Sequence, residues 1–178
     1  MTWPAHIRVA VNVSPLQFRS PGFGAVVLQA LSRSGLAPER LEIEITESVF
    51  LEGETSVLQI LHMLRNMGVR VALDDFGTGY SSLSYLRSFP FDKIKIDRSF
   101  IINVAGDESA AAIVKAIVDL AKALDMETTA EGVEDTEQLA ELRAQGCTTL
   151  QGYLFSRPLS VVAAADLIGD SRRSDRTA

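Results

Sequence analysis

Six segments with the two-residue periodicity of strands alternate along this chain with segments that have the periodicity of helices. We expect strands over 7–13, 41–47, 69–75, 92–97, 126–132 and 148–155, and helices over 23–35, 56–68, near 81–88, 108–124, 136–146 and about 160–168. Strict strand-helix alternation predicts right-handed βαβ units and a parallel sheet. Without a linker in between, residues 1–170 are expected to form one domain, followed by a polar tail over 171–178.

Each expected strand has one apolar and one polar face. In LEIEITE (41–47), for example, apolar residues alternate with Glu42, Glu44 and Thr46. Strands of a parallel sheet usually read as apolar runs, because helices cover both faces. A half-solvated sheet is one explanation, and a barrel with helices outside and polar faces in the lumen is the one we favour. A closed TIM barrel has eight units in about 250 residues, so this chain of 178 residues predicts an incomplete barrel with about six.

Polar residues recur near the carboxyl ends of these strands, the end that carries the active site of TIM barrels. Asn12, Glu44, Asp74, Asp75 and Glu131 are therefore expected to converge. Hard oxygen ligands without sulfur or imidazole suit Mg²⁺ or Mn²⁺. Adjacent Asp74 and Asp75 could merely cap a helix, but a surplus of carboxylates also suggests two metals, as in phosphoryl transfer.

Lysines lie on the polar face of the segment 92–97. Near bound metals, Lys95 could orient an attacking water or a phosphate oxygen. The alternative is a salt bridge in the lumen to Glu42 or Glu44, which is also plausible for Lys93. The spacing alone leaves both open.

Six ordered motifs add a family resemblance: VNVSP (11–15), EITE (44–47), DDFGTGYSSL (74–83), KIKID (93–97), AEGVE (130–134) and QGYLFSRP (151–158). This set resembles the EAL domain family over nearly the whole chain. The resemblance implies a TIM-like barrel that hydrolyses cyclic di-GMP to linear pGpG with Mg²⁺ or Mn²⁺.

The same resemblance implies roles for individual residues. It implies that the metal ligands are Asn12, Glu44, Asp74 and Asp75, and that Glu131 is a further metal-site carboxylate and candidate base. It makes Lys95 the positioner of the attacking water and places Glu134 and Gln151 near the substrate. The turn 76–80, with Gly77, Thr78 and Gly79, would be a mobile loop held by Glu47.

The Glu-Ala-Leu motif itself, whose glutamate is a metal ligand in the family, does not occur in this chain. The chain is then a fragment of a longer protein, a degenerate member that binds nucleotide or a partner without hydrolysis, or an enzyme completed by a second chain. Missing strands would leave unpaired edges on 7–13 and 148–155, which favour association, including a homodimer. A cyclic di-GMP phosphodiesterase and a non-catalytic receptor or interaction module therefore both remain open.

Composition narrows the partners and the compartment. A net charge of −6 argues against broad binding to duplex nucleic acid. The single cysteine, Cys147, fits a reducing compartment. Residues 1–15 show no apolar signal-peptide core, and charges interrupt the most apolar helical stretch. We therefore expect a cytoplasmic protein without a membrane span.

Overall fold

The computed structural model describes residues 3–51, 54–78 and 83–174. Its strands are β1 (Val9–Asn12), β2 (Leu41–Thr46), β3 (Arg70–Phe76), β4 (Lys93–Ile96), β5 (Glu127–Glu131) and β6 (Thr149–Gln151). Its helices are α1 (Pro15–Phe18), α2 (Phe23–Ser34), α3 (Glu54–Asn66), α4 (Leu83–Ser88), α5 (Arg98–Ile101), α6 (Glu108–Ala123), α7 (Thr136–Gln145) and α8 (Val161–Ser174), with short 3₁₀ segments η1 (Pro38–Arg40) and η2 (Glu47–Leu51).

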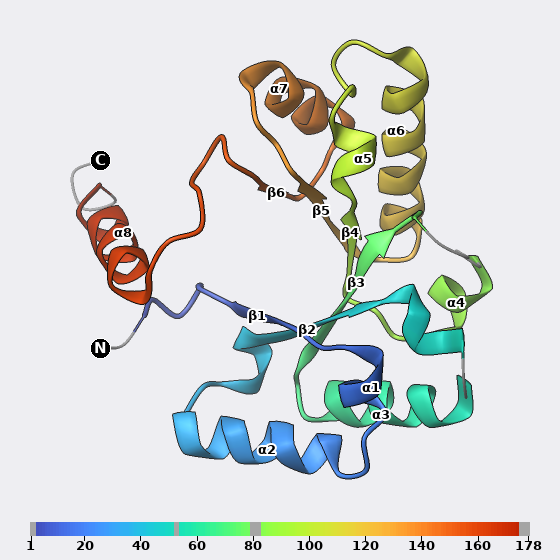
Figure 1. Cartoon of the computed structure of the whole chain (residues 1–178), viewed down its shortest axis with the longest axis vertical. Coiled ribbons are helices and arrows are strands. Elements are labelled where there is room, and N and C mark those ends of the chain that lie inside the picture. Colours follow the sequence, from blue (N-terminus) through green and yellow to red (C-terminus); the bar gives the residue numbers. More distant parts are fainter. Residues whose placement is uncertain (1–2, 52–53, 79–82, 175–178) are drawn as a thin grey trace.

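The six strands form one parallel sheet in the order of the sequence, β1 to β6 (Figure 1). Sequential order is the arrangement of a β/α barrel, whereas the strand order of a doubly wound sheet reverses at a switch point. In the described part of the chain β1 and β6 each pair on one side only, so they are the two edges. The expected incomplete barrel of six strand-helix units is confirmed.

Contacts across the polar face show that the sheet is strongly curved. Arg8, directly before β1, has Nη1 3.0 Å from Oε2 of Glu127, the first residue of β5. Four strand spacings of a flat sheet would separate these two backbones by about 19 Å, which an arginine and a glutamate side chain cannot bridge. The sheet therefore wraps around its polar face as a barrel wall does, with one side left open.

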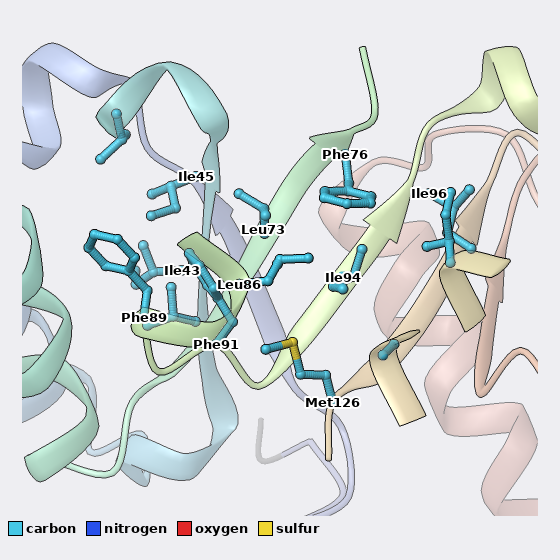
Figure 2. Packing of buried hydrophobic residues seen from close by; sticks show 14 of the residues in the cluster. Ile43, Ile45, Leu73, Phe76, Leu86, Phe89, Phe91, Ile94, Ile96 and Met126 are labelled. Atoms are coloured by element: carbon cyan, nitrogen blue, oxygen red, sulfur yellow. The ribbon is translucent and has the colours of Figure 1, made fainter. Parts of the chain in front are cut away.

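The opposite face of the sheet carries the hydrophobic core. Figure 2 shows Ile43 and Ile45 of β2, Leu73 of β3 and Ile94 of β4 packed with buried aromatic residues such as Phe89. Full burial of each such side chain contributes roughly 1.5–3 kcal/mol. Helix α3 contacts β3, and α6 contacts β4 and β5, so helices cover this face.

The edge strand β1 departs from the expected pattern on its apolar side. Val11 is 41% exposed, whereas the corresponding residues of the inner strands are buried. A helix covers a strand's outer face only where neighbouring units supply one, and β1 has a neighbour on one side only. The expected helix-covered apolar face is therefore incomplete at this edge.

Several element boundaries differ from the prediction. Strand β6 ends at Gln151, earlier than the expected 155, and α8 continues to Ser174, past the expected 168. Residues 171–174 of the expected polar tail are thus helical, while 175–178 lie outside the described residues. The expected helix ends at Gly35 and Gly68 are confirmed, with positive φ of 67° and 87°. None of the described helices combines the length and apolar composition that crossing a bilayer requires.

Candidate metal centre

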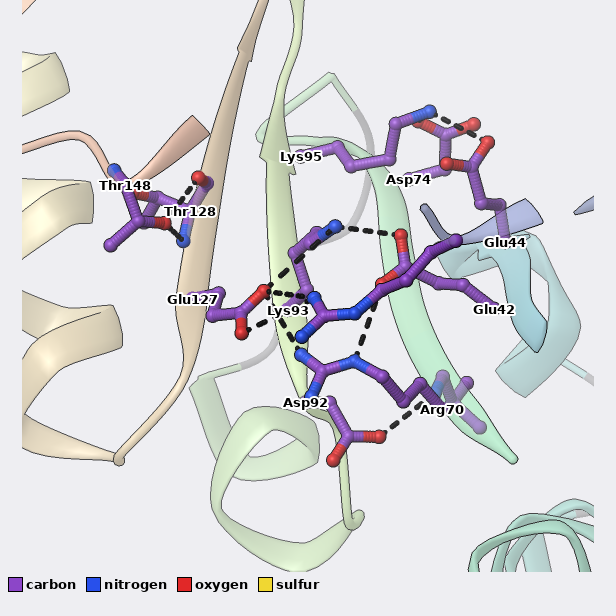
Figure 3. A network of polar contacts seen from close by, with 12 residues as sticks. Glu42, Glu44, Arg70, Asp74, Asp92, Lys93, Lys95, Glu127, Thr128 and Thr148 are labelled. Carbon is purple, nitrogen blue, oxygen red and sulfur yellow. Dashed lines mark hydrogen bonds and ion pairs between the residues drawn. The ribbon is translucent and has the colours of Figure 1, made fainter. Parts of the chain in front are cut away.

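Lys95 of β4 lies in the middle of the polar face, surrounded by carboxylates from three other strands. Its Nζ is 2.8 Å from Glu44 Oε2, 2.8 Å from Asp74 Oδ1 and 2.8 Å from Glu131 Oε1. Figure 3 shows Lys95 pointing between Asp74 and Glu44. The structure thus brings together Lys95 and three of the carboxylates predicted from the strand ends, while their roles in binding or catalysis stay predictions.

The charge balance of this cluster is negative. Burial alone would lower the pKa of Lys95, but hydrogen bonds with Asp74, Glu131 and Glu44 outweigh it and raise the pKa above its usual value. Burial also raises the pKa of Glu131 in spite of Lys95. One ammonium group therefore leaves part of the carboxylate charge unbalanced, and a divalent cation would remove that cost.

A backbone irregularity explains how two adjacent aspartates can share one site. Neighbouring residues of a regular strand point to opposite faces. The pairing of β3 with β4 shifts between Leu73 and Phe76, and Asp75 has a left-handed backbone with φ of 54°. As a result, one oxygen each from Asp74, Asp75 and Glu131 lie within 4.8 Å of one another.

Helix capping does not account for the aspartate pair. Strand β3 continues to Phe76, and Gly77 and Thr78 form a turn, so neither aspartate directly precedes a helix. Burial and the neighbouring charge of Asp74 instead raise the pKa of Asp75, with a further contribution from Asp97. Placing two carboxylates side by side is therefore costly here, and the pair fits a cation site better than a capping motif.

Asn12 at the end of β1 completes the oxygen-rich set. With its NH₂ group turned toward the acids, the amide nitrogen is 3.0 Å from Asp74 Oδ2 and 3.2 Å from Glu44 Oε2. The opposite orientation would aim the amide oxygen at the same space. The donors are therefore hard oxygens from β1, β2, β3 and β5, a set that fits Mg²⁺ or Mn²⁺ and lacks the sulfur and imidazole that zinc favours.

The turn after β3 is tied to the structure at both ends of its described part. The Gly77 amide donates to Glu47 Oε1 at 3.2 Å, and the Thr78 hydroxyl donates to the Asp75 carbonyl at 2.9 Å. Gly77 has φ of 94°, a conformation that suits glycine. The contact of Glu47 with this turn is thus present, while Gly79, the other glycine predicted here, lies outside the described residues.

Two further predicted residues lie at the rim of the sheet. Glu134 accepts a hydrogen bond from Arg98 Nη2 at 2.8 Å, and both side chains are about half exposed. Gln151, the last residue of β6, pairs in register with Glu131. Gln151 is thus the strand neighbour of one cluster carboxylate, although among the described residues no hydrogen bond joins its side chain to the cluster, and the substrate-contacting roles of Glu134 and Gln151 stay predictions.

Sequence reasoning missed α5, the short helix that follows Lys95. Asp97 caps it through a 3.0 Å hydrogen bond from the Ser99 amide. Hydrogen bonding with the Ser99 side chain, and then with this amide, lowers the pKa of Asp97. Four helical residues are too few for a periodic pattern. The available signal was Asp97 followed two residues later by Ser99, an ordinary helix-start arrangement.

A second polar layer lies below the cluster in the lumen. Lys93 Nζ is 2.7 Å from Glu42 Oε1, and Arg70 Nη2 is 3.0 Å from Glu127 Oε2 (Figure 3). The predicted salt bridge of Lys93 to Glu42 is therefore confirmed, and Lys95 makes the corresponding pair with Glu44. This layer joins β2, β3, β4 and β5 across the same polar face that carries the candidate metal centre.

A large cavity lies away from this centre. It has a volume of about 1100 Å³ and is lined at the amino-terminal ends of the strands by residues that include Arg65, Arg87 and Lys122. These three residues lie in the last turns of α3, α4 and α6. Cations at helix carboxyl ends offset the helix dipole, so their presence does not by itself indicate a ligand, and the carboxylate cluster remains the candidate site.

A curved parallel sheet with a hard-oxygen cluster at the carboxyl ends of its strands defines a β/α-barrel protein with a candidate divalent-metal centre. Residues 1–158 match the EAL domain. The chain belongs to the EAL domain family.

Relatives and solved structures agree with this assignment. The bifunctional diguanylate cyclase/cyclic di-GMP phosphodiesterase MucR of Pseudomonas aeruginosa is 47% identical over 85% of this chain and 22% of its own length. A structure titled as a PaMucR phosphodiesterase complex with c-di-GMP has a TM-score of 0.83 at 45% identity, covering 88% of this chain and 64% of that one.

Two other solved structures extend the comparison. The EAL domain of Mycobacterium smegmatis DcpA has a TM-score of 0.89 at 39% identity, over 92% of this chain and 74% of that one. Klebsiella pneumoniae BlrP1 in a manganese/cy-diGMP complex has a TM-score of 0.79 at 35% identity, over 85% of this chain and 39% of that one. The chain spans about a fifth of the length of the curated relatives it matches.

Proposed function

We propose that this chain carries the chemistry of a cyclic di-GMP phosphodiesterase that hydrolyses cyclic di-GMP to linear pGpG with Mg²⁺ or Mn²⁺ at a two-metal site. The observation that carries the proposal is the meeting of Asp74, Asp75 and Glu131 oxygens within 4.8 Å. The manganese and cyclic di-GMP in the BlrP1 complex support the same choice of metal and substrate.

The donor set suggests how the work is divided. Asn12, Glu44, Asp74, Asp75 and Glu131 would hold the divalent ions, which supply charge stabilisation at phosphate oxygens and a more acidic attacking water when bound. Attack of that water on phosphorus breaks one P–O3′ bond and leaves the 5′-phosphate of pGpG.

Two side chains would then position the attacking water and accept its proton. Lys95, held by three carboxylates at 2.8 Å, has an ammonium group in a fixed position from which it can orient the water. Burial raises the pKa of Glu131, which makes this carboxylate a better proton acceptor than an exposed one. Glu134 and Gln151, at the rim, would contact the nucleotide.

The second candidate function is a non-catalytic cyclic di-GMP receptor or protein-interaction module. These 178 residues do not include the Glu-Ala-Leu glutamate that ligates metal in the family, so on their own they could bind the nucleotide without a complete metal site. We therefore expect the 178-residue chain to hydrolyse cyclic di-GMP very slowly or not at all.

The two functions separate in one chromatographic assay of cyclic di-GMP and pGpG. Joining a segment that carries the Glu-Ala-Leu motif, taken from the MucR relative, should rescue hydrolysis in Mg²⁺. Asp75→Asn, Lys95→Ala and Glu131→Gln should each abolish the rescued activity. Tight binding without turnover in the joined protein would instead establish a receptor, and binding by neither form would leave the interaction module.

We further propose a cytoplasmic protein that associates through the edge strands β1 and β6, including as a homodimer. Unpaired backbone groups at sheet edges promote pairing with another chain. Sedimentation of the purified chain over a range of concentrations tests this, since a monomer at every concentration would exclude the homodimer.

A further inference from the structure

The short helix α5 contacts two turns that follow different strands. One is the turn after β3, which follows Asp74 and Asp75, and the other is the turn after β5, which follows Glu131. These three acids form the oxygen cluster of the candidate metal centre. No sequence motif assigned any role to α5, yet it bridges the two segments that must be correctly spaced for that cluster to form.

Phe100 makes the contact on the β3 side. A Cβ atom added to Gly77 would lie 2.9 Å from both Cε2 and Cζ of the Phe100 ring, so the ring packs directly on this glycine. Phe100 is partly buried and also packs against the main hydrophobic core. The ring therefore limits how far the turn at Gly77 can move toward α5.

Arg98 makes the contact on the β5 side. A Cβ atom added to Gly132 would lie 2.4 Å from Arg98 Cγ and 2.8 Å from its Cβ, so the aliphatic part of Arg98 covers this glycine. Its guanidinium group then reaches Glu134 at 2.8 Å. Arg98 thus holds the segment 132–134 by packing at one end and by an ion pair at the other.

Helix α5 is itself firmly anchored. Asp97 caps its first turn, and Ile101 is fully buried in the core. The helix contacts both β5 and α6. A rigid element with side chains on both neighbouring turns can set the distance between them, whereas an exposed loop could not.

We propose that α5 sets the spacing of the metal-centre carboxylates, with Phe100 and Arg98 as positioning residues for the β3 and β5 turns. The inference rests on the proposed function only in taking the cluster as a metal site. Divalent ions such as Mg²⁺ demand near-ideal geometry from their ligands. Small displacements of Asp75 or Glu131 therefore weaken binding without removing any ligand.

Calorimetric titration with Mn²⁺ alone tests the proposal without substrate. Phe100→Ala and Arg98→Ala should each weaken Mn²⁺ binding about 10–100-fold, the usual effect of removing a residue that orients metal ligands. Phe100→Leu and Arg98→Lys should restore most of the affinity, since each keeps the apolar contact with its glycine. Phe23→Ala is the matched control, because Phe23 is also a partly buried aromatic residue but packs on Phe18 of α1 instead.

Amide hydrogen exchange gives a second readout that does not depend on metal. Phe100→Ala should accelerate exchange at Gly77, and Arg98→Ala at Glu134, while Val71 in the middle of β3 keeps its wild-type rate. Wild-type affinity and exchange in both alanine variants would overturn the proposal and leave the proposed function intact. A wild-type protein that binds no Mn²⁺ would contradict the proposed function, and the exchange rates would then still decide the role of α5.

Discussion

Replacing Lys95 by methionine would test whether a divalent cation and this lysine balance the same carboxylates. At an effective dielectric of about 20, each contact at 2.8 Å contributes about 6 kcal/mol of attraction before desolvation is subtracted. Breaking a buried ion pair costs about 3–5 kcal/mol net. For a chain of this size, that corresponds to a fall of about 6–20 °C in the unfolding midpoint.

Circular dichroism melting with EDTA, and then with Mn²⁺, measures this effect. One fixed Mn²⁺ concentration, about 100 times the Kd of Lys95→Met, should stabilise Lys95→Met by about 2.7 kcal/mol. The same concentration should stabilise the wild type less, because Lys95 already balances these carboxylates. Lys93→Met is the matched control, because Lys93 is equally buried but pairs with Glu42 in the lower layer. Lys93→Met should have a lower melting midpoint than the wild type, and Mn²⁺ should raise that midpoint by no more than it raises the midpoint of the wild type. If Mn²⁺ raised the melting midpoints of both variants equally, or of neither, the reasoning would be refuted.

The pH dependence of the same variant has a defined sign. Burial raises the pKa of Glu131 above its usual 4.5 in the folded protein. At a pH between the unfolded-state pKa and the raised folded-state pKa, the folded state binds more protons than the unfolded state, so the free energy of unfolding falls as the pH rises. Because Lys95→Met removes a group that lowers this pKa, its melting midpoint should fall more steeply than that of the wild type as the pH rises above 4.5. A flat profile would contradict this.

Three other sites allow independent tests of the geometry. Gly152→Ala places a Cβ 2.0 Å from the Val133 carbonyl oxygen, so urea unfolding should show that the free energy of unfolding falls by about 3 kcal/mol or more. Gly106→Ala is the control, because its Cβ meets no atom within 4 Å and its stability should be nearly unchanged. Asp75→Val should lower the melting midpoint more than Asp75→Asn, because a β-branched residue fits φ of 54° poorly. Burial raises the pKa of Cys147 above 9.0, so its reaction with a disulfide reagent should stay slow at pH 8; rapid reaction would indicate an exposed thiol.

The faces of the strands were predictable because side-chain direction in a strand depends only on position. Alternation of period two placed Glu44, Asp74 and Lys95 on one face, and the structure has them within contact of one another. The family motifs then supplied roles that periodicity alone could not. The order of the strands followed from the rules for βαβ connections.

Features that depend on contacts between distant segments were not predictable in the same way. The side chain of Asp75 reaches the cluster because the pairing of β3 with β4 is irregular at this point. Directly after β6 ends at Gln151, Gly152 lies against the backbone of Val133, a contact that neither local sequence reveals. Helix α5 is too short for a periodic signal, so the packing of Phe100 and Arg98 on two glycines emerged only from the structure.

Calorimetric titration of Mn²⁺ into the wild-type chain and its Asp74→Ala variant tests the central claim most directly. Asp74 contacts Lys95 and lies within the oxygen cluster, so the account predicts saturable Mn²⁺ binding by the wild type and its loss in Asp74→Ala. Asp119→Ala, which removes an exposed acid of α6 that pairs with Lys115, should bind Mn²⁺ as the wild type does. An unchanged isotherm for Asp74→Ala would contradict the assignment of the metal centre.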